Sequence, residues 1–271
     1  MASQKRIDLL LTEREYFPSR NKAKRAIMAG EIYVNNQMVD KPGTRVDINA
    51  DIEVKGDSLP YVSRGGLKLE KALQIFEVDP TGKKVIDIGA STGGFTDCIL
   101  QQGAEQVYAV DVGYGQLAWK LRKDSRVQVI ERTNFRYITE QELPVKVPLI
   151  VIDVSFISLR LIIPKALQFL KEAGEILALI KPQFEAGRDK VGKKGIIKDK
   201  EIHQEVITTL SQFFDDHDLV LKGLDFSPIK GASSKNIEYL IYLKNAKEYN
   251  NDLFAWGKKI EDVVNRAHQK L

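Results

Sequence analysis

The chain has 271 residues, of which 43% are hydrophobic and 29% charged, and it carries a net charge of +4 and a single cysteine. One cysteine excludes internal disulfides and Cys-rich zinc modules and fits a reducing compartment. The mild positive charge permits a polyanionic partner without requiring one. No stretch approaches about eighteen apolar residues, and the first residues lack the pattern of a signal peptide. We therefore expect a cytoplasmic protein that does not span a membrane.

The first sixty residues predict a small α+β unit. Ile7, Leu10 and Leu11 repeat at helical spacing, and a Pro-Ser step at 18–19 ends that helix and begins a second one over 20–28. Apolar residues at 32–34 and 38–39, separated by two asparagines, indicate a hairpin, and a last strand follows near 51–55. The polar stretch 56–60 contains Pro and Gly and marks a boundary. We expect one domain over 1–58 and a second over 59–271.

The rest of the chain alternates strands and helices. Apolar runs predict strands at 85–88, 106–111, 127–132, 147–153, 175–180, 219–226 and 237–243. Amphipathic spacing predicts helices at 69–76, 95–102, 115–123, 159–171, 201–216 and 253–271. This alternation is typical of a doubly wound α/β domain with a largely parallel, Rossmann-like sheet.

The first of these strands leads into a glycine-rich turn, VIDIGASTGGF over residues 85–95. Its spacing fits neither the G-x-G-x-x-G dinucleotide fingerprint nor a P-loop. The turn resembles motif I of the S-adenosylmethionine-dependent methyltransferases, although a glycine turn of another doubly wound enzyme remains an alternative. The resemblance implies donor contacts from the strand and turn residues Asp87, Gly89, Ala90, Ser91, Thr92, Gly93, Gly94 and Phe95.

Two further residues are candidates for the donor site. Asp111 ends the next strand, where a carboxylate can accept hydrogen bonds from ribose hydroxyls. Asn134 follows the third strand, where it either contacts the adenine or makes an Asx turn. The three scattered histidines and the single cysteine predict no metal site.

Four charged residues stand where catalytic groups of such a sheet collect. Asp153 and Lys181 end strands, Glu238 lies inside an apolar run, and Lys68 opens the helix before the first strand. Each alone has a structural explanation, such as a helix cap or an ion pair. Together they resemble, in order and placement, the Lys-Asp-Lys-Glu tetrad of the FtsJ-like ribose 2′-O-methyltransferases.

The N-terminal unit resembles the S4 RNA-binding domain over residues 6–55, and the whole chain resembles the TlyA family. A basic helix alone is as often a solvated face as a nucleic-acid contact. The resemblance implies RNA contacts from Arg6, Arg20, Lys22, Lys24, Arg25 and Arg64. It also implies methylation of a ribose 2′-hydroxyl of ribosomal RNA, of cytidines in the ribosomal subunits, with S-adenosyl-L-methionine as the methyl donor.

In this hypothesis Lys181 is the central group, either as proton acceptor or as orienting cation for the hydroxyl. The basic, glycine-rich stretch 184–199 is a substrate lid or a disordered connection. Three other functions remain as alternatives. They are an inactive RNA-binding protein, a membrane-active haemolysin as the family name suggests, and a nicotinamide dehydrogenase.

Overall fold

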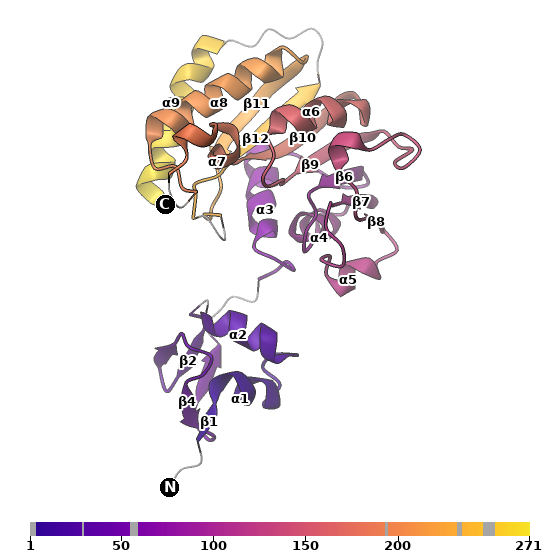
Figure 1. Ribbon diagram of the computed structural model, residues 1–271. Coiled ribbons are helices and arrows are strands. Elements are labelled where there is room, and N and C mark those ends of the chain that lie inside the picture. The colour runs from indigo at the N-terminus through magenta and orange to yellow at the C-terminus, as the bar shows by residue number, and fades with distance from the viewer. Residues whose placement is uncertain (1–3, 29, 55–58, 193–194, 232–234, 246–252) are drawn as a thin grey trace. The chain divides into compact units, whose positions relative to one another are not determined.

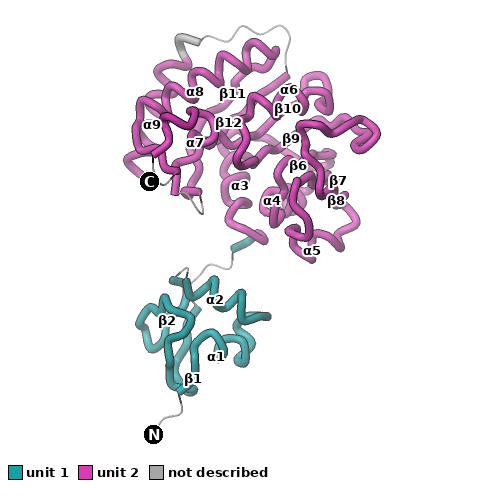
Figure 2. The backbone as a smooth tube through the Cα atoms, viewed as in Figure 1, with its two compact units in different colours: residues 1–60 teal, residues 61–271 magenta. Residues whose placement is uncertain are grey.

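The computed structural model describes residues 4–28, 30–54, 59–192, 195–231, 235–245 and 253–271. The chain divides into two compact units, residues 1–60 and 61–271 (Figures 1 and 2). Residues 55–58, where we expect the linker, lie outside the described part of the chain. Each unit has a hydrophobic core of its own.

The described residues of the first unit form two helices and five three-residue strands. The helices are α1 (Ile7–Glu13) and α2 (Arg20–Met28). The strands are β1 (Gln4–Arg6), β2 (Ile32–Val34), β3 (Gln37–Val39), β4 (Arg45–Asp47) and β5 (Ile52–Val54). The expected hairpin is confirmed, because β2 and β3 pair antiparallel and both turn residues, Asn35 and Asn36, have positive φ. Strands β1 and β4 were not expected from the sequence, since their residues, QKR and RVD, include a single apolar side chain, that of Val46.

The second unit is built on one seven-stranded sheet in the order β11-β12-β10-β9-β6-β7-β8. The strands are β6 (Lys84–Ile88), β7 (Gln106–Val110), β8 (Val127–Ile130), β9 (Val147–Ile152), β10 (Leu170–Ile180), β11 (Leu219–Phe226) and β12 (Tyr239–Asn245). The five strands from β8 to β10 run parallel, and β12 runs antiparallel to both of its neighbours. The expected α/β fold with a largely parallel sheet is confirmed.

Helices cover both faces of this sheet (Figure 1). They are α3 (Gly65–Phe76), α4 (Gly94–Gln101), α5 (Trp119–Arg122), α6 (Leu159–Gln168), α7 (Pro182–Glu185), α8 (Lys200–Asp215) and α9 (Leu253–Lys270), with 3-10 turns at Phe135–Tyr137 and Arg188–Lys190. Successive side chains of β9 point to opposite faces of the sheet and so join the two helical layers. Ile150 and Ile152 join the core under α6, α8 and α9, whereas Leu149 and Val151 join the core under α3, α4 and α5.

Several elements differ in their bounds from the sequence prediction; the helix expected over 69–76 begins at Gly65, and the one expected over 159–171 ends at Gln168. Two further differences are larger. The helix expected over 115–123 forms only at Trp119–Arg122, because Gly115 adopts a left-handed φ of 71° and Ala118 is extended, with a ψ of 139°. The strand expected from 175 begins at Leu170, with an irregularity in its pairing between Leu170 and Glu175. Neither difference moves the carboxyl ends of β6, β7, β9 and β10, which lie at one edge of the sheet because these strands are parallel.

Candidate active site

The glycine turn between β6 and α4 is built for close backbone approach. Gly89 has a φ of 86°, and a Cβ atom there would lie 2.7 Å from the carbonyl oxygen of Asp153. Gly93 has a φ of 99°, and a Cβ atom would lie 2.3 Å from a methyl group of Leu121. Any larger residue at either position clashes with backbone or core, so the turn is held against the end of β9.

A pocket of about 510 Å³ opens at this edge of the sheet. Four of the residues proposed for the donor site line it, namely Gly89, Ser91, Asp111 and Asn134. Asp153, one of the proposed catalytic residues, lines it as well. The pocket therefore runs from the glycine turn to Asp153, directly after β9.

Asp111 fixes the geometry of the pocket wall. Its Oδ2 accepts a hydrogen bond from the backbone N–H of Ser91 at 2.8 Å, and its Oδ1 accepts one from Gly113 at 2.6 Å. The Asn134 side chain accepts a hydrogen bond from the backbone of Arg136 at 3.1 Å, so it makes the Asx turn that was one of its two interpretations. It also lines the pocket, so the adenine contact stays a prediction.

The other proposed donor residues are not among those that line the pocket. Asp87 is fully buried and accepts a hydrogen bond from Thr96 Oγ1 at 2.6 Å. Burial raises the pKa of Asp87 to about 7. A Cβ atom on Gly94 would lie 2.9 Å from the backbone nitrogen of Gly66, which shows how closely α3 and α4 approach. Asp87 thus joins β6 to α4. The proposed donor residues Ala90, Thr92, Gly93, Gly94 and Phe95 lie outside the lining of the pocket as well.

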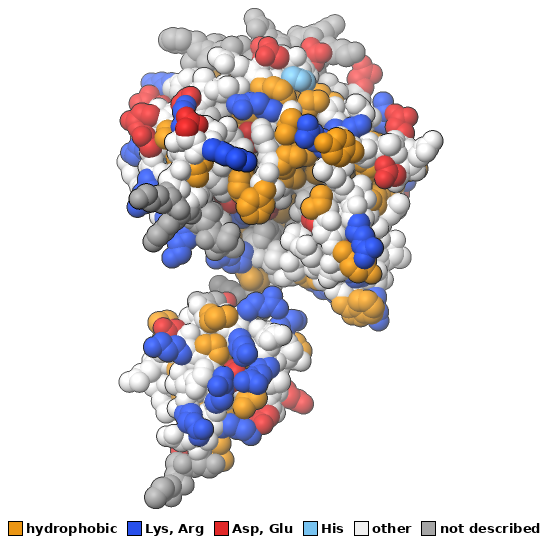
Figure 3. All heavy atoms as spheres, in the orientation of Figure 1, with side chains coloured by type: hydrophobic (Ala, Val, Ile, Leu, Met, Phe, Trp, Pro, Cys, Tyr) orange, Lys and Arg blue, Asp and Glu red, His pale blue; other side chains and the backbone are white. Residues whose placement is uncertain are grey.

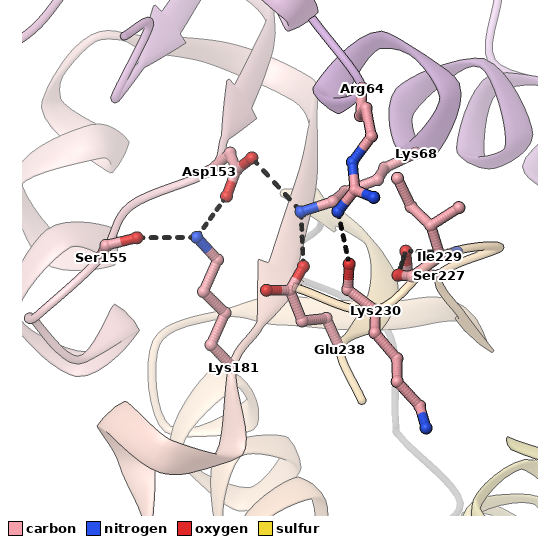
Figure 4. A network of polar contacts seen from close by, with 9 residues as sticks. All are labelled: Arg64, Lys68, Asp153, Ser155, Lys181, Ser227, Ile229, Lys230 and Glu238. Atoms are coloured by element: carbon pink, nitrogen blue, oxygen red, sulfur yellow. Dashed lines mark hydrogen bonds and ion pairs between the residues drawn. The ribbon is translucent and has the colours of Figure 1, made fainter. Parts of the chain in front are cut away.

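The four proposed catalytic residues come together as an alternating row of charges (Figure 4). Lys181 Nζ lies 2.6 Å from Asp153 Oδ1 and donates a hydrogen bond to Ser155 Oγ at 2.9 Å. Lys68 Nζ lies 3.9 Å from Asp153 Oδ2 and donates a hydrogen bond to Glu238 Oε2 at 2.5 Å. The two lysines are separated by Asp153, and two positive charges balance two negative ones.

Different elements supply these four side chains. Asp153 follows β9, and Lys181 follows β10 and precedes the Pro182 that begins α7. Lys68 lies in α3, and Glu238 directly precedes β12. Lys68, Lys181 and Glu238 are at most 8% exposed. Charges buried this deeply need partners, which the row provides.

The structure adds site residues that the sequence did not single out. Ser155 lies two residues after Asp153, lines the pocket and holds Lys181. Phe156 is 90% exposed at a φ of 63°, and its ring centroid lies 5.0 Å from that of Phe184. Ser155 and Phe156 belong to the DVSF segment at the end of a strand, and this position was the sequence feature that could have indicated them.

Glu185 fixes the same loop from the other side. Its buried carboxylate accepts hydrogen bonds from Ser158 Oγ at 2.6 Å and from the backbone N–H of Leu159 at 2.8 Å, at the beginning of α6. Burial raises the pKa of Glu185. A buried glutamate in α7 therefore ties the segment after Lys181 to the loop that carries Ser155.

The described part of the stretch 184–199 is ordered. Ile197 is buried, and its N–H donates to Asn236 Oδ1 at 2.9 Å. Asn236 also donates to the carbonyl oxygen of Gly195 at 2.7 Å. A disordered connection is therefore wrong for these residues. The substrate-lid alternative stays a prediction.

The residues proposed for RNA contact divide into two groups. Arg6 and Arg20 both donate hydrogen bonds to Asp8, which is fully buried. These bonds lower the pKa of Asp8 to about 2. Lys22 and Arg25 are exposed on α2, and Lys24 is half-buried there. In the second unit, Arg64 is exposed and donates to the carbonyl oxygen of Lys230 at 3.3 Å.

No group of three or more His, Cys, Asp or Glu side chains within the described ranges is placed to hold a metal ion. Of the helices that the structure describes, none combines the length and the apolar character needed to cross a membrane.

The parallel sheet with its antiparallel β12, the glycine turn and the row of charges define a methyltransferase of the α/β class. A family model described as FtsJ-like methyltransferase matches residues 61–245, and an S4 domain model matches residues 5–52. The chain is 52% identical to the Bacillus subtilis protein YqxC over 100% of this chain and 97% of that one. It is 38% identical to the 16S/23S rRNA (cytidine-2′-O)-methyltransferase TlyA of Mycobacterium tuberculosis, over 98% of each chain. A solved structure from Streptococcus thermophilus is 45% identical, with a TM-score of 0.79 over 100% of this chain and 98% of that chain.

The chain therefore belongs to the TlyA family of FtsJ-like methyltransferases that carry an S4 domain. The family resemblance expected from the sequence is confirmed.

Proposed function

We propose that this protein transfers a methyl group from S-adenosyl-L-methionine to the ribose 2′-hydroxyl of a cytidine in ribosomal RNA. The position of Lys181 carries the proposal. Its amino group is held between Asp153 and Ser155, and both of these residues line the pocket that reaches Asp111. The activity that names the TlyA relative supports rRNA as the acceptor. Such a substrate assigns the protein to the cytoplasm.

The pocket suits the methyl donor in size and in the chemistry of its lining. A volume of about 510 Å³ falls in the range of small-molecule sites. Gly89 offers a backbone that a ligand can approach, and Asp111 offers a carboxylate to ribose hydroxyls. Val112 is 68% exposed beside Asp111 and lines the pocket, so it offers an apolar surface to a base. When bound, S-adenosyl-L-methionine supplies an electrophilic methyl group, and the protein's part is to place the acceptor in line with it.

Lys181 then acts on the acceptor oxygen O2′. A lysine ammonium has three N–H donors, of which one meets Ser155 and a second faces Asp153. We expect the third to face the acceptor and orient O2′. The sequence leaves two roles open for Lys181, proton acceptor and orienting cation. In either role Nζ has to face O2′. Lys68 and Glu238 are positioning residues, because they act on Lys181 through Asp153.

We assign RNA recognition to residues 1–58 and catalysis to residues 59–271. The exposed cations of α2, Lys22 and Arg25, contact phosphates, which position the RNA without reading its sequence. Arg6 and Arg20 share the buried Asp8 and are 42% and 45% exposed, so their outer N–H groups remain accessible to a phosphate. Replacing Lys22 and Arg25 together by alanine should lower RNA affinity and reduce its salt dependence by about two charges. Donor affinity should not change.

The deciding experiment measures transfer of labelled methyl from S-adenosylmethionine to purified 30S and 50S subunits. Label that protects one phosphodiester bond from alkaline cleavage identifies a ribose 2′-O-methyl group. Lys181→Ala should lower the rate by about 10²–10⁴-fold and leave donor binding intact. Lys165→Ala is the matched control, because this half-buried lysine of α6 lies outside the row of charges and donates a hydrogen bond to Gln168 Oε1. A Lys181→Ala enzyme with normal activity would overturn the assignment.

A further inference from the structure

Three aromatic side chains between residues 114 and 137 each lie beneath a cation. The Arg132 guanidinium lies 4.0 Å from the ring centroid of Tyr114, and Lys123 Nζ lies 5.0 Å from that of Trp119. Arg136 lies 5.3 Å from the centroid of Tyr137. The three aromatic residues are 66–69% exposed. We call these six residues the aromatic–cation cluster.

The cations of the cluster differ from their neighbours in charge pairing. In the same stretch, Lys120 pairs with Asp97, Arg122 with Glu131 and Arg126 with Asp124. Within the described ranges, no ion pair joins Lys123, Arg132 or Arg136 to a carboxylate. Their positive charge is therefore available to an anion, while each of the other three cations is paired with a carboxylate of the protein.

The segments that carry the cluster are tied into one block beside the pocket. Glu131 accepts a hydrogen bond from the N–H of Gly115 at 2.9 Å and pairs with Arg122 of α5. The N–H of Arg132 donates to the carbonyl oxygen of Gly113 at 3.0 Å. Residues next to the cluster, among them Val112 and Thr133, line the pocket. Figure 3 shows hydrophobic side chains with Lys or Arg side chains directly beside them over the part of this unit that carries α5.

We propose that the aromatic–cation cluster is a second RNA contact, on the catalytic unit itself, that binds unpaired nucleotides near the target ribose. Exposed Trp and Tyr rings offer stacking surfaces to bases of any sequence, and the adjacent cations offer charge to the phosphates between them. Bases inside a duplex have no free face, so unpaired nucleotides are the form of RNA that fits. The inference rests on the proposed function for the identity of the ligand and extends it beyond the N-terminal unit.

The composition of the chain supplies a direct test. There are two tryptophans, Trp119 and Trp256, so Trp256→Phe leaves Trp119 as the sole reporter in the full chain. A short oligocytidylate should quench the Trp119 emission, and an RNA duplex of the same length should quench it much less. Quenching should weaken as salt is added, because phosphates displace counterions. Bound RNA, seen by anisotropy, without any change of Trp119 emission would overturn the proposal, and so would equal quenching by the duplex.

Affinity measurements on variants separate stacking from mere packing. Trp119→Ala should lower oligocytidylate affinity about tenfold, and Trp119→Phe should restore most of the loss because a ring is kept. Lys123→Gln should reduce the salt dependence by about one charge. Lys171→Ala is the matched control, an exposed lysine at the beginning of β10 and so at the opposite edge of the sheet. Equal losses in Trp119→Phe and Trp119→Ala, with unchanged melting temperatures, would contradict a stacking role.

The two proposals fail in different ways. Quenching of Trp119 by RNA without label transfer to any ribosomal subunit would refute the proposed methylation and support the RNA contact. Label transfer without quenching would refute the contact and support the methylation.

Discussion

The pair of Lys68 and Glu238 permits a quantitative test of the row of charges. Both side chains are less than 10% exposed, and Lys68 Nζ lies 2.5 Å from Glu238 Oε2. The substitution Lys68→Met keeps a long apolar side chain and removes the charge. It leaves the Glu238 carboxylate buried without its partner in α3.

The size of the effect follows from burial. Removing one partner of a buried ion pair costs roughly 3–5 kcal/mol, because the other charge stays buried and unpaired. For a unit of this size, residues 61–271, each kcal/mol lowers the melting temperature by about 2–4 °C. We expect Lys68→Met to melt roughly 6–20 °C lower. The double variant Lys68→Met/Glu238→Gln contains no unpaired charge and should regain most of the loss.

Calorimetry and methyl transfer together separate stability from chemistry. The double variant should melt near the wild type and still transfer methyl groups far more slowly, because Asp153 no longer lies between two lysines. Lys84→Met is the control, since Lys84 forms an exposed pair with Glu105 at 4.0 Å and such pairs contribute about 0–1 kcal/mol. A Lys68→Met enzyme that melts like the wild type would refute the reasoning. So would a double variant no more stable than the single one.

Three further outcomes are expected. The pKa of Asp8 is lowered from 3.8 to about 2, so its ionised carboxylate contributes stability to the N-terminal unit above pH 3.8. The unit should lose this contribution as pH falls from about 4 to 2. Asp8→Asn should remove that pH dependence in a series of melting curves. His203 is buried beside Tyr239, and desolvation lowers its pKa to about 4. The buried neutral imidazole contributes stability that is complete above pH 6.5 and is lost as pH falls toward 4. In the His203→Gln variant the melting temperature should therefore depend less on pH between these values. Gly94→Ala should impair donor binding and methyl transfer, since the new Cβ atom would lie 2.3 Å from Ser63 Oγ. Gly82→Ala is the control, because a Cβ atom there has no neighbour within 4 Å. Its φ of 67° should lower stability by only about 1–2 kcal/mol, and activity should not change.

The sequence by itself determined what depends on local chemistry. The asparagine turn between β2 and β3, the strand, glycine turn and helix from Lys84 to Gln101, and the alternation of elements all follow from local propensity and periodicity. The four charged residues also stood out locally, because a charge next to an apolar run is unusual. Their meeting at one edge follows from parallel strands.

The tertiary structure decided which of these residues touch. Lys68 and Glu238 are 170 residues apart in sequence, and only the sheet order places α3 beside the beginning of β12. The same packing buries Asp87 beneath the turn, brings Ser155 to Lys181, and ties Glu185 to the beginning of α6. Local spacing carries no information on such pairs, because the contact distance is set by strands that come from distant parts of the chain.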